Sequence, residues 1–350
     1  MARDDFTQLT KRALAERAGF RCSYPGCSSV TIGPSDEREK STSNTGEAAH
    51  IAAASAGRGA RRYDPNMTPN QRSSIDNGIW CCNTHAKLID TDEATYSVQM
   101  LQQWKVLAER RAQLWQAYGN DIDAHLSDLV AVGLAPDKVA IQDDPEISEK
   151  VGSAVQFSWL VDICGKDVAH VLRDFLIEHC RNAFSHGGAT KVNIDFHLNS
   201  IEIIDDGAEF HVAQLHSGQS RGGGKALSVL RQIKALGHVS SHRNGNGTNA
   251  VHIPFVLGPL GLPDVNPCAI ALSREAVRGN SLDVARFVSC DRVYVVAPNF
   301  VCYSDGPMFK KALWEMVNEH PNVVLILPEA SEQVVAHFRE LFPSTVVETW

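Results

Sequence analysis

Apolar side chains return every three or four residues over 168–183, which predicts an amphipathic helix with its apolar stripe turned towards a core. Asp167 is a suitable N-cap for this helix, and Gly187 can end it in the left-handed conformation. Glu178 and Asn182 are four residues apart, so a carboxylate and an amide lie one above the other on a single face.

The segment after this helix alternates apolar and polar positions. Residues 191–197 and 200–204 predict two antiparallel strands joined by a short turn. A helical run then ends near Gly237, and residues 250–256 predict a closing strand. We treat residues 151–257, which hold all of these elements, as one domain.

Helical patterns also occur in the first third of the chain. Residues 9–18 predict a short helix that stops at Gly19. Residues 97–118 predict a long helix with a stripe of leucine and tryptophan, ended by Gly119. The front of the chain, residues 1–119, is therefore expected to form a domain of its own.

Beyond residue 268, strand and helix patterns alternate. The strands are expected at 269–272, 292–297, 323–327 and 344–348, and the helices at 281–288, 308–319 and 332–341. Continuous apolar strands between helices predict a small α/β domain with a mainly parallel sheet covered on both faces. Ligands of such sheets bind at the carboxyl ends of the strands, but the sequence at 298–299 and 328–329 contains no recognised motif. We therefore expect a regulatory or docking module at 268–350, which would bind a partner protein.

Two segments rich in helix breakers separate these domains. Residues 120–150 are acidic and contain Pro136, which predicts a linker with one short helix around 126–132. Residues 258–267 contain three prolines and two glycines and predict a second linker. The fold class is therefore expected to be α/β multidomain (α+β).

Composition narrows the class of protein. The chain has 350 residues, 43% of them hydrophobic, and no run of eighteen apolar residues, so we expect a soluble protein that does not enter a membrane. The first residues lack a charged segment followed by an apolar one, which favours a cytoplasmic location. A net charge of −8 means that any binding of nucleic acid depends on a local basic patch. Nine cysteines in such a chain favour reduced thiols and metal ligation over disulfides.

Two close pairs of metal-binding residues flank a long insertion. Cys22 and Cys27 enclose a Pro-Gly turn, and Cys82 and His85 follow more than fifty residues later. Four ligands that converge from two pairs are typical of structural zinc, which is bound tetrahedrally. Cys81 competes with Cys82 for this role, but its place in an alternating strand favours burial.

Between the two pairs lies the sequence Gly46-Glu-Ala-Ala-His50-Ile51, and Asn77 precedes the second pair. Over about residues 15–110 this arrangement resembles the HNH endonuclease family, the zinc-stapled form of the ββα-metal fold. The resemblance implies that His50 is the general base that activates water against a phosphodiester, and that Asn77 orients it. It also implies a catalytic Mg²⁺ or Mn²⁺ ion and a nucleic-acid substrate, DNA rather than RNA. The arginines of the insertion that could contact phosphates are Arg58, Arg61 and Arg62.

The ligands of the catalytic ion are where the chain departs from that family. An aspartate often precedes the base histidine, and a histidine often follows the second zinc ligand, but Ala49 and Ala86 occupy these positions. The substitutes that spacing leaves open are Glu47, Asp64 and Asp90. His85 is also a candidate for the catalytic ion, in which case Cys81 would complete a structural site of three thiols.

The middle domain contains three further polar turns. Asp205-Asp-Gly207 ends the second strand, where a carboxylate can accept from the amino group of a base and the glycine permits close approach. A glycine-rich run over 218–224 opens the next helix, whose backbone N–H groups can hold phosphate. Gly247-Thr248 forms another tight turn before the closing strand.

In this order the helix and the three turns resemble the GHKL ATPase superfamily, and most of all the anti-sigma-factor and histidine kinases, whose helix carries Glu-x-x-x-Asn-x-x-x-His-Gly. The resemblance implies a GHKL α/β sandwich that binds ATP. Asn182 would hold Mg²⁺, Glu178 would be the candidate base, and Asp205 would contact adenine. The other residues that it assigns to the nucleotide are His186, Gly207, Gly222, Gly224, Gly247 and Thr248. Glu209 and Ala226 replace glycines that are usual in the family.

These resemblances predict an ATP-regulated, metal-dependent HNH endonuclease with a structural zinc ion, and by analogy a bacterial anti-phage defence effector. Because GHKL proteins often dimerise, we expect a homodimer. One alternative is a GHKL-type protein kinase with a degenerate HNH domain that serves as an adaptor for nucleic acid or protein. A second alternative is an ATP-responsive scaffold without catalytic activity.

Overall fold

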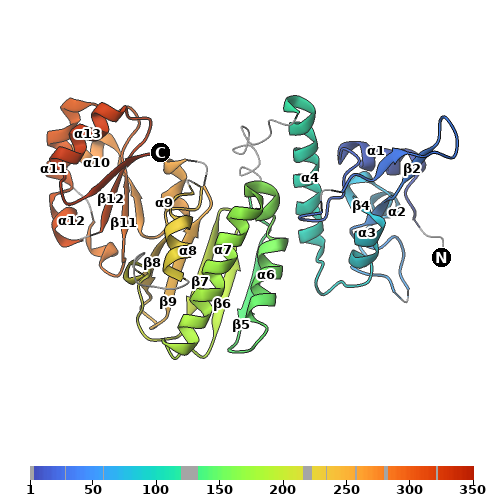
Figure 1. Ribbon diagram of the computed structural model, residues 1–350, viewed down its shortest axis with the longest axis horizontal. Coiled ribbons are helices and arrows are strands. Elements are labelled where there is room, and N and C mark those ends of the chain that lie inside the picture. Colours follow the sequence, from blue (N-terminus) through green and yellow to red (C-terminus); the bar gives the residue numbers. More distant parts are fainter. Residues whose placement is uncertain are drawn as a thin grey trace. The chain divides into compact units, whose positions relative to one another are not determined.

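The computed structural model shows a mixed α/β chain with several sheets, one of them parallel (Figure 1). It describes residues 4–27, 29–57, 59–119, 133–215, 223–233, 235–256, 258–279, 283–320 and 322–350. These form two compact units, each of which takes two stretches of the chain. Unit 1 consists of Met1–Ala135 and Gln156–Cys164, and unit 2 of Pro136–Val155 and Gly165–Trp350.

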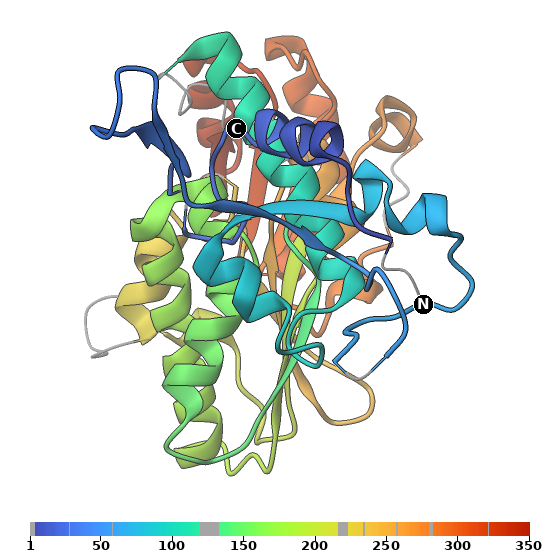
Figure 2. The same cartoon turned by 90° about the vertical axis from the view of Figure 1, so that its right-hand side faces the viewer.

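Unit 1 is built on a β-hairpin followed directly by a helix (Figures 1 and 2). Strand β3 (Gly46–His50) pairs antiparallel with β4 (Gly78–Cys82). Helix α3 (Asn83–Ile89) starts where β4 ends and packs on both strands, and α1 (Gln8–Arg17) also contacts both. The short elements around them are β1 (Ile32–Pro34), β2 (Thr42–Asn44), α2 (Pro69–Arg72) and the 3-10 turn η1 (Ile75–Asn77).

The two faces of the hairpin have different partners. Ala48 and Trp80 are paired in register and pack with Phe6 and Leu14 on the side of α1. Because side chains alternate along a strand, Ala49 points to the opposite face, where it is buried. The two sides of this small hairpin are therefore both covered, as a two-stranded ribbon requires for stability.

Helix α4 (Val98–Tyr118) confirms the long helix expected at 97–118. Ser97 caps it by accepting a hydrogen bond from the backbone N–H of Met100, and Gly119 ends it with a φ of +63°. Its fully buried Trp104 lies edge-on to Tyr24, with a centroid distance of 5.1 Å. This aromatic cluster anchors α4 beside the hairpin.

Unit 2 begins with a five-stranded antiparallel sheet of order β5-β6-β7-β9-β8. Its strands are β5 (Asp137–Ile141), β6 (Val192–Phe196), β7 (Ser200–Asp205), β8 (Ser240–Arg243) and β9 (Asn249–Pro254). Helices α6 (Ile147–Phe157), α7 (Leu160–Ser185) and α8 (Gly223–Leu230) lie over one face of the sheet (Figure 1). Short turns of 3-10 helix occur at η3 (Val212–Gln214) and η4 (Pro259–Gly261).

Several expectations for this region need correction. The segment 120–150 is not a linker throughout, because residues 137–141 form β5 and pair with β6. Strand β8 was not predicted, and its four residues are too few to show a period. Gly188, not Gly187, takes the left-handed conformation at the end of α7, with a φ of +65°. The short helix expected at 126–132 lies outside the described residues.

The C-terminal part of unit 2 is a parallel sheet, as predicted, with strand order β10-β11-β12-β13. Its strands are β10 (Ala269–Ala271), β11 (Val293–Val296), β12 (Val323–Leu327) and β13 (Val346–Thr349). The helices are α9 (Leu262–Val265), α10 (Arg274–Gly279), α11 (Gly306–Ala312), α12 (Trp314–Glu319) and α13 (Glu332–Leu341), with 3-10 turns η5 (Ala285–Phe287) and η6 (Tyr303–Asp305). The helix expected at 308–319 is thus divided into two, and of the one expected at 281–288 the described part is η5.

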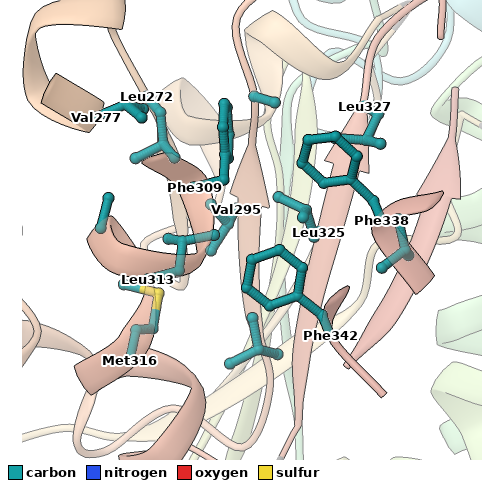
Figure 3. Packing of buried hydrophobic residues seen from close by; sticks show 14 of the residues in the cluster. Leu272, Val277, Val295, Phe309, Leu313, Met316, Leu325, Leu327, Phe338 and Phe342 are labelled. Carbon is teal, nitrogen blue, oxygen red and sulfur yellow. The ribbon is translucent and has the colours of Figure 1, made fainter. Parts of the chain in front are cut away.

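The two faces of the parallel sheet are covered differently. Leu313, Phe338 and other residues of α10 to α13 pack with Val295 and Leu325 on one face (Figure 3). Tyr294 and its neighbours pack with residues of α9 on the other face. A sequential strand order with right-handed crossovers places all intervening helices on one side, which explains this asymmetry.

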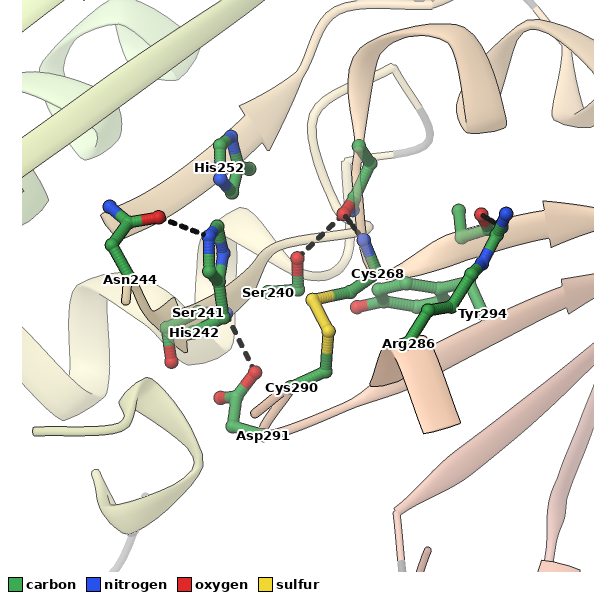
Figure 4. The surroundings of a disulfide bond; sticks show 12 residues. Ser240, Ser241, His242, Asn244, His252, Cys268, Arg286, Cys290, Asp291 and Tyr294 are labelled. Carbon is green, nitrogen blue, oxygen red and sulfur yellow. Dashed lines mark hydrogen bonds between the residues drawn. A yellow bond between two sulfur atoms is a disulfide. The ribbon is translucent and has the colours of Figure 1, made fainter. Parts of the chain in front are cut away.

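A disulfide joins Cys268 and Cys290, with a sulfur–sulfur distance of 2.03 Å (Figure 4). The expectation that the cysteines are reduced thiols is therefore wrong for this pair. Cys268 directly precedes β10 and Cys290 lies shortly before β11, so the pairing of these parallel strands brings the two together. Within the described residues, no helix combines the length and the apolar character needed to cross a membrane.

Replacing the fully buried Leu325 of β12 by alanine should lower the free energy of unfolding by about 2–5 kcal/mol, because the core cannot close around the lost side chain. Leu260→Ala is the matched control, since Leu260 is 53% exposed and should change the value by less than about 0.5 kcal/mol. Denaturant titration followed by circular dichroism measures both. Equal destabilisation by the two substitutions would contradict this packing.

Candidate functional site

Cys22, Cys27, Cys82 and His85 converge in unit 1, as predicted from their spacing. One ligand atom from each lies within 4.8 Å of the others. Cys22 and Cys27 flank a turn in which Gly26 has a φ of +72°. Cys82 is the last residue of β4 and the N-cap of α3, so His85 falls in the first turn of that helix. The hairpin–helix junction therefore presents one pair to the other.

The donor set fits a tetrahedral metal ion such as Zn²⁺. The Nδ1 atom of His85 lies 3.5 Å from the Cys22 sulfur and 3.2 Å from the Cys82 sulfur. Ordinary Zn–S and Zn–N bond lengths give ligand separations of about 3.6 Å in a tetrahedron. Tyr24 stacks on His85 at a centroid distance of 3.8 Å and holds the imidazole in this orientation.

The pKa values of Cys22 and its neighbour Cys81 are shifted in opposite directions. A hydrogen bond with Cys81 is the main cause that lowers the pKa of Cys22, to about 4, against the opposing effect of burial. The same hydrogen bond, together with burial, raises the pKa of Cys81 well above its usual value. Cys22 is thus a thiolate, the form that binds metal, whereas the fully buried Cys81 remains a thiol. Burial also raises the pKa of Cys82, to about 11, so protonation does not choose between the two candidates. The position of the Cys82 sulfur, 3.2 Å from the Nδ1 of His85 and within the converging set, supports Cys82 over Cys81 as the ligand.

A buried ion pair secures the Cys22–Cys27 turn. The Arg111 guanidinium of α4 donates to the carbonyl of Cys22 at 3.0 Å and to Asp162 at 2.7 Å. Asp162 in turn accepts from the backbone N–H of Gly26 at 2.7 Å. The Arg111–Asp162 pair therefore holds the turn at both ends, at the carbonyl of Cys22 and at the N–H of Gly26.

His50 ends β3 and lies beside a strongly braced turn. Its ring stacks on Phe6 at 3.9 Å, and it lines two cavities of about 370 and 300 Å³. The Nδ2 of Asn77 donates to the carbonyl of Ala52 at 2.8 Å, and its Oδ1 accepts from the N–H of Ala52 at 2.8 Å. The carbonyl of Asn77 accepts from the N–H of Ile51 at 2.8 Å. Buried Asn77 therefore positions the residues next to His50 through the backbone.

Arg62 does not face phosphate, in contrast to the prediction. Its side chain is only 4% exposed and donates to the carbonyls of Ile51 and Ile89 at 2.6 and 2.7 Å. It therefore joins the His50 turn to the end of α3. Arg61 remains 40% exposed and lines the 300 Å³ cavity with His50. Arg58 lies outside the described residues.

The residues between β3 and α3 do not fit a catalytic divalent ion. Ala49 and Ala86, at the positions where the HNH resemblance implies ligands, are 3% and 1% exposed and offer no donor atom. Of the substitutes, Asp90 lines the 300 Å³ cavity with His50 and Glu47 lines the 370 Å³ cavity. Asp64 lines neither of these two cavities, and its carboxylate accepts from the N–H of Asn66.

Three of the predicted nucleotide residues, Glu178, Asn182 and His186, lie at the C-terminal end of α7 in unit 2. Glu178 is 32% exposed and 3.5 Å from Arg181, and Asn182 lies one turn further on the same face. The carbonyl of Asn182 accepts the N–H groups of His186 and Gly187. His186 is exposed at the end of the helix. These side chains are available to a ligand that lies along this face.

Asp205 ends β7 in a network of buried polar groups. Its Oδ1 accepts from Asn249 at 2.8 Å and from the N–H of Gly207 at 3.0 Å, and its Oδ2 lies 3.4 Å from the Nε2 of His179. Burial alone would raise the pKa of Asp205, but the contacts with His179 and Asn249 lower it below the ordinary value. The carboxylate is therefore held ionised in a fixed orientation.

The glycines of this region are placed for close approach. A Cβ on Gly207 would meet the carbonyl of Gly187 at 3.1 Å, so any other residue there would push the Asp205 turn and the end of α7 apart by a few tenths of an ångström. Gly247 has a φ of +82° in the β8–β9 turn, where Thr248 bonds with the side chain of Asn246. Gly224 lies in the first turn of α8. Gly222 lies outside the described residues.

His179, Asn249 and Arg243 were not predicted as site residues. Arg243 of β8 donates to the carbonyl of Gly207 at 2.8 Å and to the Oδ1 of Asn249 at 2.6 Å. Asn249 faces Asp205 in register across the β7–β9 pair.

The Cys82→Ser variant should lose the zinc that the wild-type protein retains through extensive dialysis, because it removes one of four converging ligands. Cys81→Ser is the matched control and should keep the metal. Elemental mass spectrometry of the purified variants measures this. Retention in Cys82→Ser together with loss in Cys81→Ser would contradict the ligand assignment.

Comparisons with protein-family models, curated proteins and solved structures find no match for this chain. Its chemistry is therefore inferred from the geometry described above.

Proposed function

We propose that the chain is a nucleotide-controlled phosphodiesterase that acts on DNA. Unit 1 carries an HNH-type hydrolytic site around His50, and the five-stranded part of unit 2 binds ATP. The observation that carries this proposal is the placement of His50 at the end of β3, beside a turn whose Ile51 and Ala52 make three hydrogen bonds with buried Asn77.

The role of His50 follows from its surroundings. An imidazole that lines an open cavity can accept a proton from water that attacks a phosphodiester. Arg61 lines the same cavity and is suited to balance the charge on the phosphate. The ring of Phe6 stacks on the imidazole of His50 and restricts its rotation. The ring nitrogens are therefore held in one orientation towards an attacking water.

The proposed ATP site rests on the end of α7 and the turn after β7. Asn182 would hold Mg²⁺ and Glu178 would orient water, one helical turn apart. The ionised Asp205 would accept a hydrogen bond from the amino group of adenine. Asn249 and His179 fix the direction in which its lone pairs point.

A second candidate function is supported by the buried Ala49 and Ala86. Without metal ligands on the face between β3 and α3, unit 1 would bind nucleic acid or protein as an adaptor and would not cut. Unit 2 would then act as an ATP-dependent switch or as a GHKL-type kinase.

The His50→Ala variant should cleave plasmid DNA at least about 100-fold more slowly than the wild-type protein, because it removes the proposed general base. Purified protein is incubated with plasmid and with Mg²⁺, Mn²⁺ or chelator, each with and without ATP. His170→Ala, an exposed histidine of α7, is the control and should cleave normally. Cleavage by His50→Ala at the wild-type rate would exclude this role, and DNA binding without cleavage by either protein would favour the adaptor.

The Asn182→Ala variant should bind Mg²⁺–ATP at least about tenfold more weakly and keep its zinc content, because it removes the proposed oxygen ligand of the nucleotide-bound ion. Asn318→Ala, an exposed amide of α12, is the matched control and should bind normally. Isothermal calorimetry measures both affinities. Unchanged affinity in Asn182→Ala would exclude the assigned role.

A further inference from the structure

One face of the five-stranded sheet, opposite to α7, carries an open hollow of about 970 Å³ that residues of the α9 segment border. Its lining combines imidazole and carboxylate groups from four different segments: His197 before β7, Glu202 on β7, His242 on β8 and His252 on β9. All of these belong to unit 2, whereas the Cys22–His85 cluster belongs to unit 1. None of them takes part in the site proposed for ATP.

Glu202 lies between two of the imidazoles. It faces His252 in register across the β7–β9 pair, and its Oε1 lies 3.7 Å from the Nε2 of His252. Its Oε2 lies 4.0 Å from the Nε2 of His197. Both separations exceed a direct hydrogen bond, so the carboxylate is near two nitrogens without being bonded to either.

His252 is the fixed member of this group. Its side chain is 9% exposed, and its Nε2 is buried without a hydrogen-bond partner although it lines the hollow. The ring stacks on His242 at a centroid distance of 5.0 Å and an interplanar angle of 4° (Figure 4). His242 is held in turn by Asn244, 2.8 Å from its Nε2. A buried imidazole nitrogen that is oriented by its neighbours and has no partner is suited to bind a ligand.

The chemical groups that line the hollow indicate which class of ligand it would bind. The Nε2 of His252 is buried at the lining without a hydrogen-bond partner, so a bound ligand would supply the contact that the protein does not. Glu202 and Asp264 are carboxylates in the same lining. Imidazoles beside carboxylates favour a cation, and nitrogen with oxygen donors suits a borderline transition metal such as Zn²⁺ or Ni²⁺.

We propose that His252, Glu202 and His197 bind a second metal ion of this class on the open face of the five-stranded sheet. Metal–ligand distances of about 2.1 Å require donor atoms about 3.0–3.4 Å apart, closer than those in the structure. His197 is 47% exposed and Glu202 is 27% exposed, so these two side chains rotate towards His252, which stays in place. Binding would tie the β6–β7 turn to the inner strand β9.

The test counts metal ions on the full-length protein. Equilibrium dialysis against micromolar Zn²⁺, followed by elemental mass spectrometry, should give two bound ions per wild-type chain. Glu202→Gln and His197→Ala should each bind one, with the affinity of the second site weakened at least tenfold. Both positions are partly exposed, so the fold is retained, which unchanged thermal unfolding verifies.

Two controls separate this site from the cysteine cluster. His170→Ala, which removes an exposed histidine elsewhere, should still bind two ions. Cys82→Ser should lose the ion of unit 1 and keep the other. In that background, Co²⁺ should give a spectrum without the thiolate charge-transfer band. One ion in the wild-type protein, or two ions in both Glu202→Gln and His197→Ala, would overturn the proposal.

Discussion

The convergence of Cys22 and Cys27 with Cys82 and His85 is the constraint on which unit 1 depends. Its central hairpin has two strands of five residues each, which is marginal without further support. The second pair of ligands sits where β4 becomes α3, so a metal held there fixes the angle between strand and helix. That angle in turn sets the position of the turn beside His50.

Unit 2 relies on a different kind of constraint, a buried network of polar groups around Asp205. The carboxylate joins β7 to β9 through Asn249, and Arg243 carries the network on to β8. A second carboxylate, that of Asp291 before β11, accepts from the N–H groups of Ala213 and Ser241 at 2.9 and 2.6 Å. Ala213 lies shortly before the glycine-rich run. Asp291 therefore joins η3 and β8 to the start of the parallel sheet.

The metal ligands, the longer helices and the apolar strands were predictable from the sequence. Paired ligand spacing identified all four members of the cluster, and helical periodicity gave α4 within one residue and the part of α7 that follows its kink at Gly165. The continuous apolar runs of β11 and β12 identified the parallel sheet. These signals are local in sequence. The structures that they predict could be recognised because neighbouring residues determine them.

The features that the sequence did not predict depend on contacts between residues that are distant in the chain. β5 was taken for a linker because its five residues become a strand only when β6 pairs with them. The disulfide joins residues that only the register of β10 and β11 brings together. Arg62 was expected to contact phosphate because it lies in a cluster of arginines. The sequence does not show that backbone carbonyls surround its side chain in the folded protein. His179 was hidden in a helix whose neighbouring residues carried the recognised motif.

The central claim is that metal binding at the cysteine–histidine cluster holds the turn beside His50. Amide hydrogen exchange, followed by mass spectrometry on metal-loaded and metal-stripped protein, tests this most directly. We expect stripping to speed exchange at Ile51 and Ala52, whose N–H groups bond to Asn77, and to leave β6, β7 and β9 of unit 2 unchanged. Unchanged protection of Ile51 and Ala52 in the metal-free protein would contradict the account.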